Sequence, residues 1–187
     1  RPERRAASWW CDAPAAWGGG CGNAYTRRMA RYVVVLPLVP LERGDEFTVA
    51  EWPLHVTVVE PFESSETPER LGAALAPVAA RAHTVRTTAG EDAWFGRRRD
   101  VLVSLVRDGG EIAALRDAAL AALAPLGLDP QRVRPDFRPH VTVKRHGRLF
   151  PGDHVVFDRL ALIDMRPPAG SHHRAVVGLL TLDHRAP

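Results

Sequence analysis

Residues 52–61 read WPLHVTVVEP, and residues 137–146 read FRPHVTVKRH. Both stretches contain His-Val-Thr-Val shortly after a proline, beginning at His55 and at His140. Valine and threonine favour extended backbone, so each tetrapeptide predicts a β-strand. Side chains two residues apart on a strand share a face. Each histidine is therefore expected to lie beside its threonine, while the valines face the core.

A single His-x-Thr would carry little weight. The 8 histidines and 9 threonines of this 187-residue chain would form about 0.4 such pairs by chance. Two copies that match at both valines, each after a proline, are much harder to attribute to coincidence. If the two strands lie side by side, the imidazoles of His55 and His140 and the hydroxyls of Thr57 and Thr142 converge on one site.

Two histidines and two hydroxyls suit the cleavage of a phosphodiester. One neutral imidazole can take a proton from water or from a ribose hydroxyl, and a protonated imidazole can give one to the leaving oxygen. Histidine serves both roles because its ordinary pKa is about 6.5. The threonine hydroxyls can bind the non-bridging oxygens, which carry negative charge in the transition state.

The second stretch also resembles a known family motif. Phe137 to Arg145 matches the Phe-x-Pro-His-x-Thr-aliphatic-x-Arg pattern of the 2H phosphoesterases, which include 2′-5′ RNA ligase-like and cyclic nucleotide phosphodiesterase proteins. The resemblance extends over about residues 30–184. It implies a bilobal, duplicated α+β fold with antiparallel sheets, two main helices and a central cleft. It also implies metal-independent catalysis without a cofactor, on 2′,3′-cyclic or 2′-5′ phosphodiester linkages of RNA ends or small nucleotides.

Carried over residue by residue, the resemblance assigns the acid/base pair to His55 and His140. It assigns the substrate phosphate to Thr57, Thr142 and Arg145. The sequence departs from the family after the first motif, where residues 60–62, Glu-Pro-Phe, replace an aromatic-Leu-Gly turn that many members have. An acid so near the site would repel a long polyanion, which favours small substrates over large RNA.

Two other functions remain open. The first is a binding module that holds RNA ends or cyclic phosphates without turnover, although the intact motifs disfavour it. The second is a metal-dependent hydrolase with His55 and His140 as ligands, which a chelator would distinguish. Five of the other histidines could suggest a zinc site, but they show no zinc-ligand spacing such as His-Glu-x-x-His; they are His146, His154, His172, His173 and His184.

The rest of the chain shows alternating strand and helix patterns. Strands are predicted at residues 31–38, 55–60, 83–95, 100–106, 140–145, 154–165 and 174–184. Helices are predicted from Pro68 onward, with a kink or early end at Pro77, and from about Glu111 to Pro125. Arg97, Arg98 and Arg99 form a basic turn that is either a solvated hairpin end or a rim that attracts nucleic acid.

Composition limits the class of protein. With 45% hydrophobic residues, 25% charged residues and a net charge of +3, the chain is typical of a globular protein. No apolar run approaches the ~18 residues of a membrane span. Cys11 and Cys21 lie outside the periodic part of the chain. We expect a disordered extension over residues 1–28, a single bilobal domain over residues 29–187, and a cytoplasmic monomer.

Overall fold

The computed structural model describes residues 29–183, and the extension predicted over residues 1–28 lies outside this range. Within the described residues, nine strands form one sheet in the order β2-β9-β8-β1-β3-β6-β5-β4-β7, and adjacent strands are antiparallel. The strands are β1 (Ala30–Pro37), β2 (Glu46–Thr48), β3 (His55–Ser64), β4 (Val85–Phe95), β5 (Val101–Val106), β6 (His140–Thr142), β7 (His154–Phe157), β8 (Arg159–Asp164) and β9 (His173–Thr181). The two motif strands, β3 and β6, are neighbours in the middle of this order.

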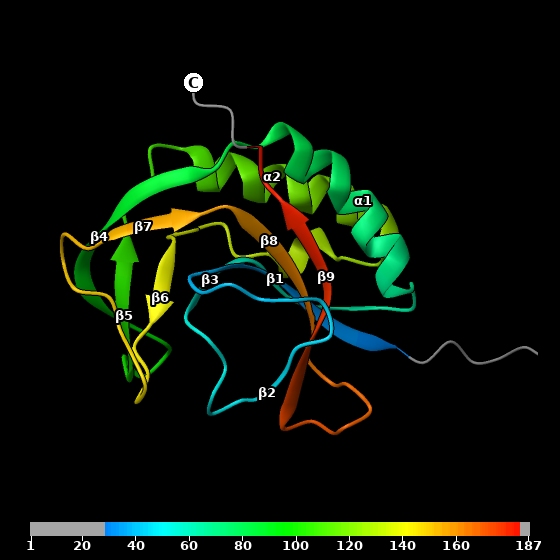
Figure 1. Cartoon of the computed structure of the whole chain (residues 1–187), viewed down its shortest axis with the longest axis horizontal. Helices are drawn as coiled ribbons and strands as arrows, with labels where there is room; N and C mark the ends of the chain where they lie inside the picture. Colours follow the sequence, from blue (N-terminus) through cyan, green and yellow to red (C-terminus); the bar gives the residue numbers. More distant parts are fainter. Residues whose placement is uncertain (1–28, 184–187) are drawn as a thin grey trace, which may run out of the picture.

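Two helices cover one side of the curled sheet, as Figure 1 shows. They are α1 (Pro68–Arg81) and α2 (Glu111–Leu123), and a 3-10 turn at Ala124–Leu126 follows α2. Thr67 caps α1 by accepting a hydrogen bond from the Arg70 amide at 3.3 Å. No helix among these residues is long and apolar enough to span a bilayer.

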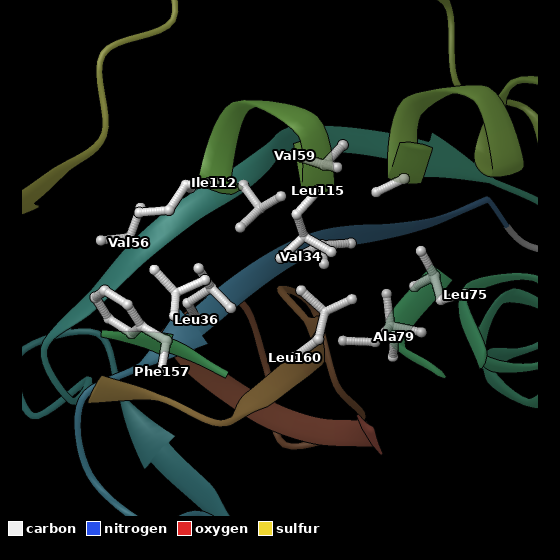
Figure 2. Close-up of a cluster of buried hydrophobic side chains, with 14 of the residues drawn as sticks. Val34, Leu36, Val56, Val59, Leu75, Ala79, Ile112, Leu115, Phe157 and Leu160 are labelled. Atoms are coloured by element: carbon white, nitrogen blue, oxygen red, sulfur yellow. The ribbon is translucent and has the colours of Figure 1, made fainter. Parts of the chain in front are cut away.

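The main core lies between the helices and the sheet. The close-up in Figure 2 shows Val56 of β3 with Ile112 and Leu115 of α2 in this cluster. Val141 of β6 is buried in the same cluster. Because side chains alternate along a strand, the histidines and threonines of both motifs face the opposite side of the sheet, away from the helices.

A smaller core lies on that opposite side. Its buried members are Val33, Val35, Ala161, Ile163 and Val176, and Trp52 packs against them. Val35 is the register partner of Thr57, so this second core is on the same face as the motif side chains. Through Trp52, this core packs against the segment that precedes β3.

Several details differ from the sequence-based prediction. Helix α1 does not end early at Pro77. The proline removes the hydrogen bond to the carbonyl of Ala73, but both residues are exposed, so water can bind that carbonyl instead. The predicted strand at residues 154–165 is two strands, since Phe157 pairs with β4 and Arg159 pairs with β9. The predicted strand at residues 140–145 stops at Thr142, and β2 was not predicted.

Candidate active site

The two His-Val-Thr segments lie side by side. Val56 of β3 is the register partner of Val141 of β6 in an antiparallel pair. This register sets His55 opposite Thr142, and Thr57 opposite His140, on the face away from the helices. The two histidines are diagonal neighbours, and such positions are about 7–8 Å apart in an antiparallel pair. A phosphoryl group placed between them could contact both imidazoles.

Both imidazoles are oriented in the same way. Nδ1 of His55 donates to the Pro53 carbonyl oxygen at 2.7 Å, and Nδ1 of His140 donates to the Arg138 carbonyl oxygen, also at 2.7 Å. A carbonyl oxygen only accepts, so Nδ1 must carry the hydrogen in each ring. Nε2 is then the nitrogen that can exchange a proton with a substrate, and this holds for both histidines.

The environment keeps His55 neutral. Burial, helped by the positive charges of Lys144 and His140, lowers the pKa of His55 to about 4 against the opposing effect of the Pro53 carbonyl. The unfolded chain would bind this proton near the ordinary value of 6.5. The folded state therefore loses stability from this group as the pH falls from 6.5 towards 4.

His140 is less buried than His55. Burial again lowers the pKa of His140, and the charges of Arg134 and Arg138 lower it further. The carbonyl of Arg138 works in the opposite direction. The two imidazoles thus share a hydrogen-bond pattern but not an electrostatic environment.

Trp52 and Lys144 form the surroundings of His55. The indole of Trp52 stacks on the His55 ring with 4.3 Å between centroids and 27° between planes. Nζ of Lys144 donates to the Trp52 carbonyl oxygen at 2.6 Å and lies 5.2 Å from the indole centroid. Burial lowers the pKa of Lys144. Trp52 therefore holds the imidazole in place and positions the single lysine of the chain beside it.

Phe95 of β4 takes the corresponding place beside His140. Its ring centroid is 4.6 Å from the His140 centroid, with the planes tilted by 57°. The guanidinium of Arg138 lies 5.4 Å from the same ring. Each histidine is therefore flanked by one aromatic ring and one cation, but the residues differ.

Of the predicted phosphate ligands, the two threonines lie beside the histidines, whereas Arg145 lies in a neighbouring turn. The hydroxyls of Thr57 and Thr142 make no hydrogen bond to any residue in the range 29–183, so both can accept a ligand. Arg145 is exposed in a two-residue turn closed by hydrogen bonds between Lys144 and Gly147. The structure brings Lys144 to His55 but shows no contact of Arg145 with either histidine. The roles assigned to all five predicted residues stay predictions.

Glu60 does not present a free negative charge. Its Oε1 accepts from Arg116 of α2 at 2.9 Å, and the Arg116 side chain is 4% exposed. Arg116 also donates to the carbonyls of Val58 and Arg134. This ion pair compensates the charge that the sequence suggested would repel a polyanion.

The other histidines do not form a metal site within the described part of the chain. No three His, Cys, Asp or Glu side chains in residues 29–183 gather closely enough to hold a metal ion. His184 lies outside the described residues.

Three neighbours of the motif were not predicted from the sequence. Lys144 continues the alternation of His140 and Thr142, so its place on the same face could have been found from spacing alone. Trp52 lies shortly before His55 in the chain and carries no distinctive local pattern. Phe95 reaches His140 from β4, and only the order of the strands reveals this contact.

The charge of Lys144 should be visible in the titration of His55. In Lys144→Met the pKa of His55 is expected to rise, because a nearby positive charge no longer disfavours the imidazolium. Methionine keeps a long side chain against Trp52. The measurement is a pH titration of the His55 ring by ¹H–¹⁵N NMR.

Arg145→Met is the matched control, since it removes the same charge from the next residue. It should leave the pKa of His55 unchanged. An equal rise in both variants would show that net charge, and not the contact of Lys144, acts on His55.

Comparisons with known proteins identify the family and the fold. The sequence model of the 2′-5′ RNA ligase superfamily matches residues 36–156. None of the curated proteins matches this sequence. The protein TT0787 of Thermus thermophilus is 19% identical with a TM-score of 0.57, covering 83% of this chain and 100% of that one.

Structures of E. coli LigT are similar to this chain as well. The apo form is 17% identical with a TM-score of 0.59, covering 84% of this chain and 99% of LigT. The complex of LigT with 3′-AMP is 17% identical with a TM-score of 0.55, covering 84% of this chain and 100% of LigT. At these identities the likeness shows the fold, and it confirms the predicted α+β class with antiparallel strands and two main helices.

Proposed function

Because this chain belongs to the 2′-5′ RNA ligase superfamily, we propose that it is a metal-independent phosphodiesterase acting on 2′,3′-cyclic or 2′-5′ phosphodiester linkages. The substrates would be RNA ends or small nucleotides. The reverse reaction, formation of a 2′-5′ linkage, would use the same groups.

One observation carries this proposal. Two imidazoles on adjacent strands have Nδ1 fixed by a carbonyl, at 2.7 Å in each case, and so have Nε2 available on the same face. Acid/base catalysis needs one proton acceptor and one proton donor within reach of the same phosphoryl group. The diagonal placement of His55 and His140 supports such an arrangement.

The unlike surroundings support a division of roles. The low pKa of His55, about 4, keeps this imidazole neutral at physiological pH, which suits a general base. The pKa of His140 is lowered as well, but this ring is less buried than His55, so we assign to His140 the proton for the leaving oxygen. Opening of a 2′,3′-cyclic phosphate would then transfer one proton from water to His55 and one from His140 to the departing ribose oxygen. The transfers leave total charge balanced, and the reverse reaction exchanges the roles.

The hydroxyls and the cations suit the substrate phosphate. Thr57 and Thr142 flank the diagonal between the histidines and can donate to its non-bridging oxygens. Lys144 supplies a positive charge on the same side as His55. Arg145 would contact the phosphate only if its side chain turns towards the site from the neighbouring turn.

The experiment is turnover by the wild-type protein in the presence of EDTA. We expect hydrolysis of a 2′,3′-cyclic mononucleotide or of a 2′-5′-linked dinucleotide, followed by chromatography of the products. Activity that disappears with EDTA and returns with a divalent metal would contradict the metal-independent mechanism. Tight binding of either nucleotide without turnover would instead identify a binding module.

A further inference from the structure

The hairpin formed by β4 and β5 ends beside the proposed active site. Phe95, the last residue of β4, contacts the ring of His140. The turn that follows contains Arg97, Arg98 and Arg99, and all three are exposed. The turn therefore begins directly after the side chain that contacts His140.

The turn holds its arginines outward in a defined conformation. Gly96 has φ +89°, and a Cβ there would lie 2.8 Å from Oδ1 of Asp100, so a side chain at this position would disturb the turn. Arg99 adopts φ 50°, and its amide donates to the Gly96 carbonyl at 3.1 Å. Within residues 29–183, none of the three guanidiniums takes part in an ion pair, so all three charges are available to an anion.

An exposed tryptophan accompanies these charges. Trp94 is 59% exposed, and together with Arg99 it lines a surface hollow of about 440 Å³. Proteins that bind single-stranded nucleic acid often combine an exposed aromatic ring with nearby cations. A base stacks on the ring, and the phosphates contact the cations. A solvated hairpin end would need the arginines but not the indole.

The strand edge leaves a route between the two sites. β7 pairs with β4 only from Val85 to Thr88, so the part of β4 near Phe95 has no strand on that side among the described residues. Phe95 and Trp94 are consecutive and face opposite sides of β4. A nucleotide chain can therefore pass from the histidines, over this free edge, to the hollow at Trp94.

We propose that Trp94 and the Arg97–Arg99 turn form a subsite for the nucleotides that precede the reacting end, which makes oligonucleotide ends the preferred substrates of this protein. The inference rests on the proposed function, because it names the substrate class of the same site. It also reverses the expectation from Glu60 that small substrates are favoured, since that charge is paired with Arg116.

The test compares two substrates that share the reacting group. One is 2′,3′-cyclic AMP, and the other is a tetranucleotide that ends in the same cyclic adenosine. Trp94→Ala and the triple variant R97Q/R98Q/R99Q are each expected to raise KM for the tetranucleotide about 10-fold, because base stacking or phosphate binding is removed. The kcat/KM for 2′,3′-cyclic AMP should change less than about 2-fold.

Net charge needs its own control. The triple variant R43Q/R70Q/R166Q removes three exposed arginines elsewhere on the surface, with 63%, 63% and 48% side-chain exposure. It should leave KM for both substrates unchanged. Salt gives a second readout, because the slope of log KM against log salt should fall by about 0.7 for each phosphate that the hairpin variant no longer binds.

The outcomes separate this inference from the proposed function. If wild type turns over both substrates but the hairpin variants change neither, or change both equally, the subsite is wrong and the phosphodiesterase stands. If neither substrate is turned over, binding of the labelled tetranucleotide by fluorescence anisotropy decides. Weakening of about 10-fold in Trp94→Ala supports the subsite, and unchanged binding overturns it.

Discussion

His55→Ala and His140→Ala are each expected to lower kcat for a 2′,3′-cyclic mononucleotide by about 10²-fold or more, the usual effect of losing a general acid or base. The two variants are expected to have similar effects, because each imidazole donates from Nδ1 to a carbonyl at 2.7 Å and has Nε2 free for catalysis. The measurement is steady-state turnover with EDTA present. The double variant should lose little more than either single variant, because the two groups act in one step.

His154→Ala is the matched control for these variants. His154 is an exposed histidine at the start of β7, on the far edge of the sheet from β3. Its turnover should remain within about 2-fold of wild type, since surface substitutions away from such sites have small effects. Retention of wild-type activity by either motif variant would remove that histidine from the mechanism. Circular dichroism of each variant separates lost chemistry from lost folding.

Arg116→Met is expected to reduce the free energy of unfolding by about 3 kcal/mol, because it removes a buried guanidinium and leaves the half-buried Glu60 carboxylate without its ion-pair partner. Arg116 connects α2 to β3 and to the segment before β6. It donates to the carbonyls of Val58 in β3 and of Arg134, and it pairs with Glu60. Its guanidinium also lies 4.4 Å from the Phe137 ring centroid. The segment that leads into β6 is thereby fastened to β3. The measurement is urea unfolding followed by circular dichroism.

The chain provides a close control for this second prediction. Arg43 and Glu69 form a pair of the same kind at the same 2.9 Å separation, but their side chains are 63% and 66% exposed. Exposed pairs contribute about 0–1 kcal/mol, so Arg43→Met should change the free energy of unfolding by less than about 1 kcal/mol. Equal effects of the two substitutions would show that Arg116 is not a buried structural charge.

Much of the fold could be predicted from local pattern. The alternation of valine with polar residues identified the motif strands, and the Thr67 cap followed by Pro68 identified the start of α1. The expectation that the helix could end at Pro77 was wrong. The buried residues Leu71, Leu75 and Ala79 stabilise the helix through its opposite face. Three-residue β2 has no run long enough to show a period, and its pairing with β9 depends on distant sequence.

Only the motif residues of the candidate site could be predicted from the sequence. The repeated tetrapeptide predicted that His55 and His140 would lie close together, since two matched strands suggested adjacency. The surroundings of each ring could not be predicted in the same way. Phe95 reaches His140 from a strand two places away in the sheet, and the Arg116–Glu60 pair elsewhere in the fold likewise joins a helix to a strand. Such contacts depend on the strand order and the helix position, which no local pattern encodes.

The pairing of β3 with β6 has a consequence for substrate polarity. Each strand supplies one histidine and one threonine, in the same order and related by an approximate two-fold rotation. A set of groups with that symmetry cannot tell one end of a phosphodiester from the other, because turning the ligand around gives equivalent contacts. Only the unlike neighbours break the equivalence, with Trp52 and Lys144 on one side and Phe95 and Arg138 on the other. A nucleotide chain that binds as proposed would therefore take its direction from residues outside the repeated motif.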